Sequence, residues 1–339
     1  MVIAVWGLVL QCAVGASLGP FAAISAPAAP SRWEFHENLM GTEFRIVIHA
    51  ADRSAAHRAA LRAFRRIEEL EERLSDYRED SELSLAVQNA AAEPVILSAD
   101  LFQALSTALR WAYRSRGALD PTVKPVARLW KEALQSGKTP AAEVLERACR
   151  RVGFRKVLLN PRTRSLKLTE PGVELDLGAL GKGFAADAAW EVLREEGFPH
   201  SLVDAGGDVR LGFPPPGRPC WHVKVPEALL QGGALCLRSG AVATSGDTLQ
   251  GRMIEGRWYS HLLDASTCRP VDFRTTVTVV AADATTADAL ATVFAVAPMP
   301  EVVTVAGAAG VEVALLRSGT GGVQRWTSPG LRALTVRAE

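Results

Sequence analysis

The apolar positions in the first half of the chain recur with the period of an α-helix. Over residues 54–75 one stripe carries the apolar side chains Leu61, Phe64, Ile67, Leu70 and Leu74, while Arg and Glu residues fill the opposite face. A second stripe begins after the potential cap Ser98, ends before Gly117, and consists of Leu101, Leu105, Leu109 and Ala112. Residues 141–151 predict a third helix. We therefore expect the first half to be mainly helical.

Strand patterns appear early and then dominate the second half. Residues 43–50 alternate between apolar and polar, residues 157–159 and 166–168 flank a turn, and residues 173–177 form an apolar run. A helix is expected at 182–196. Beyond Gly197 the predicted strands are 201–203, 221–225, 234–237, 258–263, 275–281 and 311–315, interrupted by a helix at 286–296.

These elements predict an α+β fold. Helices prevail in the first half and strands in the second, and the sequence shows no internal repeat and no low-complexity linker. The economical arrangement is one compact body in which helices pack on a mainly antiparallel sheet.

Composition and charge exclude several classes of protein. The 339 residues include 38 Lys and Arg against 37 Asp and Glu, a net charge of +1, so we expect no nucleic-acid partner. Hydrophobic residues make up 48% and charged residues 22%, which is ordinary for a globular protein and unlike a disordered or polytopic membrane protein. Five widely spaced cysteines without a C-x-x-C pair predict neither a zinc ribbon nor a disulfide framework, and leave the compartment open.

The N-terminus indicates the location of the protein. Residues 1–31 contain no charged side chain, residues 2–10 are apolar, and small residues precede Pro27 and Pro30. This pattern is typical of an export signal, with an uncleaved hydrophobic anchor as the alternative. We therefore expect the folded domain at 32–339, in the periplasm or on the outer face of the cytoplasmic membrane.

A glycine-rich segment, residues 176–183, stands between a predicted strand and a helix. Glycines there would let the backbone approach a phosphate at the helix N-terminus. A Walker site is excluded because Gly183, not Ser or Thr, follows Lys182, and Asp176 replaces the first glycine. Residues 181–186 match a loose dinucleotide pattern, but no second βαβ unit follows. The structural alternative is a turn that allows tight packing of the helix on the strand.

Three polar residues in the second half suggest chemistry. Asp288 and Thr292 lie four apart in a predicted helix, so their oxygens share a face that could bind Mg²⁺; alternatively Asp288 interacts only with the helix dipole. His261 lies on a predicted strand and could act as a base, or could be a core histidine. The polar turns 206–208 and 244–247 stand at strand ends, where binding loops are common.

Taken together, these segments occur in an order found in one family. The ordered segments are Met40–Thr42, Ser75–Tyr77 with Asp80–Glu82, Leu119–Val123 with Leu129–Trp130, Asp176–Gly183 continuing to Asp187, Gly206–Asp208, Ala243–Asp247, Tyr259–His261 and Ala287–Thr292. Over residues 33–330 the chain closely resembles the ApbE family of FAD:protein FMN transferases.

The resemblance implies a Mg²⁺-dependent enzyme. It would cleave FAD and attach FMN through a phosphoester to a threonine of a partner protein, with AMP as the leaving group. The acceptor would be a flavin-carrying subunit of a membrane redox complex, recognised through a short Ser/Thr-containing motif. The FAD site would comprise Met40, Tyr77, Ala118, Leu119, Asp120, Asp176 and Lys182. Mg²⁺ would be held by the carbonyl of Ala179, Asp288 and Thr292, with Thr285 as a further ligand.

His261 matches the family histidine implicated in flavin transfer, and would take the proton from the acceptor threonine.

Two departures from the family pattern leave alternatives open. The family usually has Asp-Pro-Arg-Thr-Gly where this chain has residues 264–268, Asp-Ala-Ser-Thr-Cys, and Thr248 replaces a common aromatic residue. The alternatives are an FAD pyrophosphatase, which would release free FMN and AMP, and a flavin-binding protein without catalysis.

Overall fold

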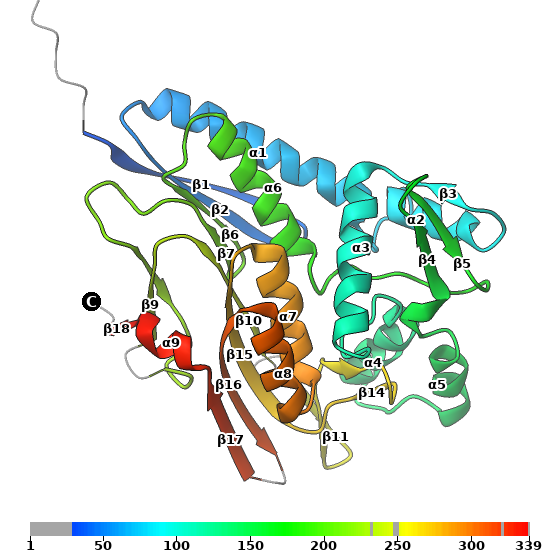
Figure 1. Ribbon diagram of the computed structural model, residues 1–339. Coiled ribbons are helices and arrows are strands. Elements are labelled where there is room, and N and C mark those ends of the chain that lie inside the picture. Colours follow the sequence, from blue (N-terminus) through cyan, green and yellow to red (C-terminus); the bar gives the residue numbers. More distant parts are fainter. Residues whose placement is uncertain (1–28, 231–232, 247–250, 320–321, 338–339) are drawn as a thin grey trace, which may run out of the picture.

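An eight-stranded antiparallel sheet forms the centre of the molecule (Figure 1). The computed structural model describes residues 29–230, 233–246, 251–319 and 322–337. In sheet order the strands are β1 (Ser31–Leu39), β2 (Thr42–Ala50), β6 (Ser201–Ala205), β7 (Asp208–Leu211), β10 (Gly240–Gly246), β15 (Arg274–Ala281), β16 (Glu312–Gly319) and β17 (Gly322–Thr327). Helices pack on this sheet, so the predicted α+β class is confirmed.

Both faces of the sheet are covered, and most inner strands present apolar side chains to both sides. In β2, Phe44, Ile46 and Ile48 join the core under the helices, while Val47 joins a second core on the other face. The helices of the first face are α1 (Arg53–Leu74), α3 (Ala99–Arg114), α6 (Gly181–Glu195), α7 (Ala284–Val296) and α8 (Met299–Ala309). The opposite face is covered by β8 (Trp221–Lys224), β9 (Gly233–Leu237), β18 (Thr335–Arg337) and α9 (Pro329–Leu334), as Figure 1 shows.

The helix predicted at 54–75 is α1, and most of its stripe is buried. Phe64, Ile67 and Leu70 are at most 5% exposed. Leu61 was predicted in this stripe, but it is 49% exposed. The buried face of α1 instead includes the alanines at positions 56, 59, 60 and 63. Small side chains allow a close approach, so the buried stripe is centred on the alanines and not on Leu61.

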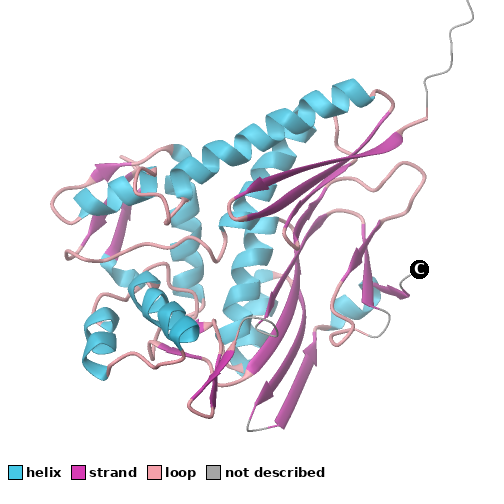
Figure 2. Cartoon of the chain, turned by 180° about the vertical axis from the view of Figure 1, so that it is seen from behind, coloured by secondary structure: helices cyan, strands magenta, loops and turns pink. Residues whose placement is uncertain are grey.

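A lobe of short elements stands beside the sheet and its helices (Figure 2). It contains α2 (Glu82–Ala90), β3 (Val95–Ile96), α4 (Lys124–Ser136), α5 (Ala142–Cys149), the short 3-10 helix Phe154–Lys156, β4 (Val157–Asn160) and β5 (Ser165–Leu168). β4 and β5 pair as the predicted hairpin. Four further short strands lie near this lobe, namely β11 (Arg252–Ile254), β12 (Arg257–Tyr259), β13 (Leu263–Asp264) and β14 (Arg269–Pro270).

Two predicted strands are wrong. Residues 173–177 are not a strand, although Val173, Leu175 and Leu177 are buried as the apolar pattern suggested. The segment is held by single contacts, such as the Asp176 amide donating to the Pro121 carbonyl (2.7 Å). The strand predicted at 258–263 is interrupted because the Ser260 hydroxyl accepts a hydrogen bond from the Leu262 amide (3.0 Å). His261 therefore lies on a bend between β12 and β13.

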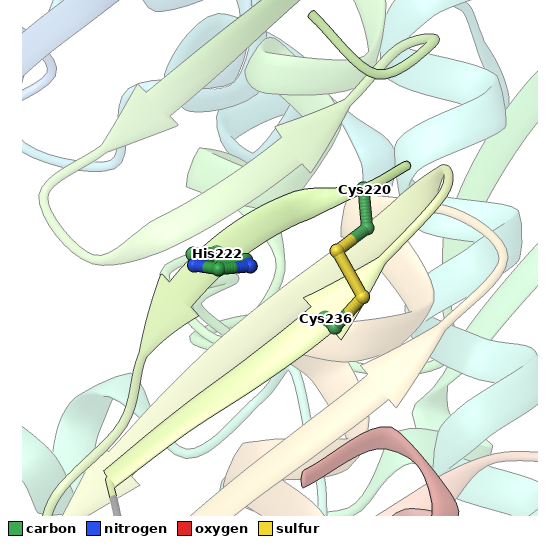
Figure 3. A group of neighbouring side chains, drawn as sticks. All are labelled: Cys220, His222 and Cys236. Carbon is green, nitrogen blue, oxygen red and sulfur yellow. A yellow bond between two sulfur atoms is a disulfide. The ribbon is translucent and has the colours of Figure 1, made fainter. Parts of the chain in front are cut away.

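The cysteine spacing predicted no disulfide framework, but the structure contains two disulfides. Cys149 pairs with Cys268, and Cys220 pairs with Cys236. The first bond joins residues 119 positions apart, and only the tertiary fold brings them together. The second disulfide joins Cys220, the residue before β8, to Cys236 in β9. Figure 3 shows it beside His222. The ligand atoms of Cys220, His222 and Cys236 lie within 4.8 Å of one another, but the two sulfurs are bonded together and are not free thiolates.

In the part of the chain that the structure describes, no helix has both the length and the apolar character needed to cross a bilayer. The predicted export signal or anchor lies almost wholly in residues 1–28, outside the described residues.

Candidate functional site

A cavity of about 440 Å³ lies where the N-terminus of α6, the inner face of α7 and the segment after β12 meet. Its walls include the side chains of Lys182, Asp288, Thr292 and His261, which come from three distant parts of the sequence. Ala179 and Asp208 also line it. The cavity therefore combines carboxylates, a hydroxyl, an ammonium and an imidazole, a set that could bind and process a charged ligand.

Hydrogen bonds at the start of α7 fix the direction in which this helix presents its side chains. Asp187 on α6 accepts hydrogen bonds from the backbone amides of Ala284 and Thr285, both at 2.8 Å, and from the Thr285 hydroxyl at 2.6 Å. Asp283 caps the same helix by accepting from the Thr286 amide (2.7 Å). With the first turn held, Asp288 and Thr292 follow one helical turn apart and both face the cavity.

Gly183 allows α6 to approach α7 closely. A Cβ at this position would lie 2.2 Å from the carbonyl oxygen of Ala284 and 2.9 Å from the Cβ of Asp288. In place of a side chain, the Gly183 amide donates to Asp288 Oδ2 at 3.0 Å. The glycine therefore places the positive N-terminal end of α6 against the Asp288 carboxylate.

We expect Gly183→Ala to destabilise the protein by about 3 kcal/mol, because the added methyl group must push backbone apart. The free energy of unfolding in urea measures this. Gly307→Ala, in α8, is the matched control, because a Cβ there meets nothing within 4 Å and should be neutral or stabilising. Equal stability of the two variants would show that the contact between α6 and α7 adapts without cost.

The acidic groups of the cavity are crowded and buried. Asp208 and Asp288 are each 5% exposed, and both lie beside Lys182, whose Nζ forms an ion pair with Asp208 and lies 3.6 Å from Asp288 Oδ2. Burial and the charge of Asp208 raise the pKa of Asp288 to about 7, although Lys182 and the Gly183 amide oppose the shift. Burial alone would lower the pKa of Lys182, but Asp288 and Asp208 raise it above its ordinary value. Two carboxylates thus share one ammonium, an arrangement that a further cation would relieve.

Asp176 also lines this cavity. Its Oδ1 accepts a hydrogen bond from the Gly178 amide at 2.6 Å. Burial, followed by the negative charge of Asp76, raises the pKa of Asp176 to about 6. Because the folded-state pKa lies above the unfolded value of 3.8, the folded chain binds the proton more tightly. Ionisation of this carboxyl group therefore lowers the free energy of unfolding as the pH rises from about 4 to above 6.

Asp176→Asn should accordingly raise the free energy of unfolding of the metal-free and flavin-free chain at pH 8 by about 2 kcal/mol. At pH 4 the variant and the wild type should be equally stable, because the carboxyl group is then largely protonated in the folded chain. Urea titrations at both pH values measure the difference. A variant less stable than the wild type at pH 8 would contradict the direction of this shift.

The segment after His261 forms a tight hairpin beside the cavity. Leu263 pairs with Pro270 and Asp264 with Arg269. The Asp264 carboxylate accepts hydrogen bonds from the Ser266 amide (2.8 Å), the Ser266 hydroxyl (2.6 Å) and the Thr267 hydroxyl (3.1 Å). Cys268 has φ 55°, a left-handed conformation that costs a non-glycine residue of order 1 kcal/mol. The turn thus closes without the proline and glycine of the family pattern. Thr248 and Asp247 lie outside the described residues.

Comparison with known proteins identifies the family. The ApbE family model matches residues 40–315. This chain belongs to the ApbE family. Among curated relatives, the FAD:protein FMN transferase of Chlamydia pneumoniae is 30% identical over 265 residues, covering 77% of this chain and 81% of the relative. The transferase of the same name from Treponema pallidum is 31% identical over 275 residues, covering 76% of each chain.

Solved ApbE structures share the fold. The ApbE protein of Thermotoga maritima is 29% identical and superposes with a TM-score of 0.78, covering 91% of this chain and 100% of the other. The flavin transferase ApbE of Vibrio cholerae is 25% identical with a TM-score of 0.77, covering 90% and 100%. The described architecture is therefore the ApbE fold.

The residues that the ApbE resemblance implies for FAD divide between two adjoining cavities. Ala118, Leu119, Asp120, Asp176 and Lys182 line the first cavity with His261 and Asp288. Met40 and Tyr77 line a second cavity of about 310 Å³, which shares Leu177, Gly178 and Lys182 with the first. Tyr77 is 82% exposed and its ring stands at the rim. All seven predicted residues thus border one continuous region.

Asp120 also has a structural role. One carboxylate oxygen accepts hydrogen bonds from the Thr122 amide (2.8 Å) and hydroxyl (2.6 Å), and the other accepts from the Phe154 amide (2.8 Å). Since the side chain is 8% exposed and engaged at both oxygens, its main contribution is to shape the cavity wall.

Of the four residues predicted to hold Mg²⁺, Ala179, Asp288 and Thr292 line the first cavity. Thr285 lies apart from them. Its hydroxyl donates to Asp187, and it borders a different cavity together with Arg210 and Trp190. In this structure Thr285 anchors α7 rather than facing Asp288.

Sequence reasoning did not select Asp208 as a site residue. It appeared only as part of the turn 206–208, yet it is buried in the cavity wall and pairs with Lys182. The signal for it was the position of this polar turn at a strand end, where binding loops are common.

Proposed function

We propose that this protein is a Mg²⁺-dependent FAD:protein FMN transferase. It transfers FMN from FAD to a threonine hydroxyl of a partner protein, forms a phosphoester and releases AMP. The observation that carries this proposal is the convergence of His261, Lys182 and Asp288 on one cavity, together with membership of a family whose curated relatives bear that name.

The cavity suits a magnesium ion. Asp288, the Thr292 hydroxyl and the Ala179 carbonyl supply oxygen ligands, which this cation prefers. The pair of buried carboxylates, Asp208 and Asp288, carries more negative charge than Lys182 balances. When bound, the ion would neutralise charge on the phosphate oxygens of FAD. Asp288 and Thr292 would hold it, and Asp208 would keep Lys182 oriented toward the same oxygens.

The two adjoining cavities suit a ligand with two ring systems joined by a pyrophosphate. Lys182 belongs to the wall that both cavities share, where an ammonium would neutralise the central charges of FAD. Tyr77 offers an exposed ring at the rim of the second cavity for stacking on an aromatic group. The chain thus supplies positioning and charge neutralisation, which are the main requirements of phosphoryl transfer.

His261 is the proposed general base. A threonine hydroxyl is a weak nucleophile until a base takes its proton. The imidazole of His261 lines the cavity that holds Asp288 and Lys182, so it can receive that proton as the threonine oxygen attacks the FMN phosphorus. The bond from that phosphorus to the bridging oxygen breaks, and the oxygen leaves on AMP.

The proposed location is outside the cytoplasm, on the periplasmic side of the membrane. The uncharged N-terminus supports export, and two disulfides suit an oxidising compartment. The acceptor would then be an exported subunit of a membrane redox complex with a Ser/Thr-containing motif.

In-gel flavin fluorescence tests the function. The purified chain is incubated with FAD, Mg²⁺ and an acceptor domain bearing a candidate threonine, beside an acceptor in which valine replaces that threonine. We expect a fluorescent band only with the threonine acceptor, and its loss with EDTA. Free FMN and AMP without a labelled band would favour a pyrophosphatase, and bound FAD that is never cleaved would favour a non-catalytic flavin-binding protein.

A further inference from the structure

We propose that the Cys149–Cys268 disulfide positions the His261 segment, so that rapid flavin transfer requires the oxidised cysteine pair. This inference rests on the proposed function, because its activity readout is FMN transfer. Neither cysteine lines the ligand cavity. The disulfide would act through residues 262–268, which connect His261 to Cys268.

Cys268 is tied closely to the cavity wall through the hairpin that follows His261. Leu262, Leu263 and Ala265 line the cavity together with His261. The Val271 amide donates to the Leu262 carbonyl at 3.0 Å and closes the base of this hairpin. A shift of Cys268 would therefore move a short, hydrogen-bonded unit whose first residues form the wall around the imidazole.

The other end of the disulfide is anchored in the helical lobe. Cys149 is the last residue of α5, which packs on α4, and α4 also contacts β14. From α4, the Trp130 indole donates to the Cys268 carbonyl at 2.9 Å and stacks on Tyr259, with ring centroids 5.2 Å apart. A small apolar cluster of Val126, Trp130, Ala133, Leu145, Ile254 and Cys268 fills this junction. The disulfide thus fastens the His261 segment to the packed pair of helices α4 and α5.

The local sequence provides little stiffness of its own. Residues 264–268 contain neither proline nor glycine, and Cys268 adopts the left-handed φ of 55° that glycine adopts more readily. Without the covalent bond, this turn would be held only by hydrogen bonds: those to Asp264, the one from Trp130, and the pairing of β13 with β14. We infer that the disulfide replaces the restraint that proline and glycine would give to such a turn.

The second disulfide offers a matched control. Cys220–Cys236 covers the opposite face of the sheet, and none of the described residues that line the two cavities belongs to β8 or β9.

The Cys149–Cys268 bond lies near the surface without being fully open, because Cys149 is half-buried and Cys268 is 2% exposed. Dithiothreitol reduces such a bond by thiol exchange: its two thiols become a cyclic disulfide, and the two electrons and two protons pass to the cysteine sulfurs.

The test compares kcat and KM for transfer in the oxidised and reduced full chain. Three proteins are assayed: wild type, the pair Cys149→Ser with Cys268→Ser, and the pair Cys220→Ser with Cys236→Ser. We expect reduction of the wild type to lower kcat by about tenfold or more, with KM for FAD changed by less than about twofold. Reoxidation should restore kcat. The 149/268 variant should be slow and insensitive to reductant, whereas the 220/236 variant should behave like the wild type.

Hydrogen exchange of residues 260–271 gives a readout that does not depend on activity or on the Ser variants folding. Reduction of the wild type should speed exchange in this segment and leave α1 unchanged. Reduced wild type with the kcat and loop exchange of the oxidised enzyme would overturn the proposal. An oxidised enzyme that transfers no FMN would instead refute the proposed function, while loop exchange would still decide whether the disulfide holds the segment.

Discussion

Asp288→Asn will lower the rate of FMN transfer by about 10³-fold, because it removes the one carboxylate among the three cavity residues proposed to hold Mg²⁺. The variant should still fold, since asparagine keeps the size of the side chain and can still accept from the Gly183 amide. At pH 8 it should even be more stable without metal, because burial raises the pKa of Asp288 to about 7 and the ionised carboxylate opposes folding there.

Transfer rates over a range of Mg²⁺ concentrations test this expectation. Asp52→Asn is the control, because Asp52 caps α1 away from the cavity and asparagine caps helices equally well. An Asp288→Asn variant that matches the control at ordinary Mg²⁺ concentrations would exclude Asp288 as a ligand. A defect that disappears at high Mg²⁺ would instead confirm weakened binding of the ion.

His261→Ala will reduce kcat for transfer by about 10²–10⁴-fold, the range typical of losing a general base. FAD binding should change much less, because Lys182, Asp176 and the glycine-rich segment remain in place. Single-turnover transfer rates and FAD titrations separate the two effects. His222→Ala, an exposed histidine on β8, is the control. A His261→Ala enzyme with wild-type kcat would show that another group takes the threonine proton.

The sequence predicted the elements whose pattern is local and strong. The helix capped by Ser98, the hairpin of β4 and β5, and the amphipathic α1 all depend on spacing within one segment. β1 was not predicted, because this edge strand is mostly exposed and has no clear alternation. The apolar run 173–177 was predicted as a strand because burial without a partner strand produces the same pattern.

The candidate site was predictable as a set of residues but not as a shape. The ordered motifs pointed to His261, Lys182 and Asp288, and the fold brings all three to one cavity. Three features depend on contacts between distant segments: the tight approach at Gly183, the sharing of Lys182 by two carboxylates, and the Cys149–Cys268 bond. No spacing in a single sequence encodes such pairings.

The stoichiometry of AMP against protein-bound FMN tests the central claim most directly. The oxidised enzyme is incubated with FAD, Mg²⁺ and the acceptor, AMP is quantified by chromatography, and the acceptor is weighed by intact mass spectrometry. A transferase releases one AMP for each FMN that it attaches to an acceptor threonine. Both quantities should fall together in Asp288→Asn. AMP with matching free FMN and an unmodified acceptor, using an acceptor that another ApbE enzyme labels, would contradict the account.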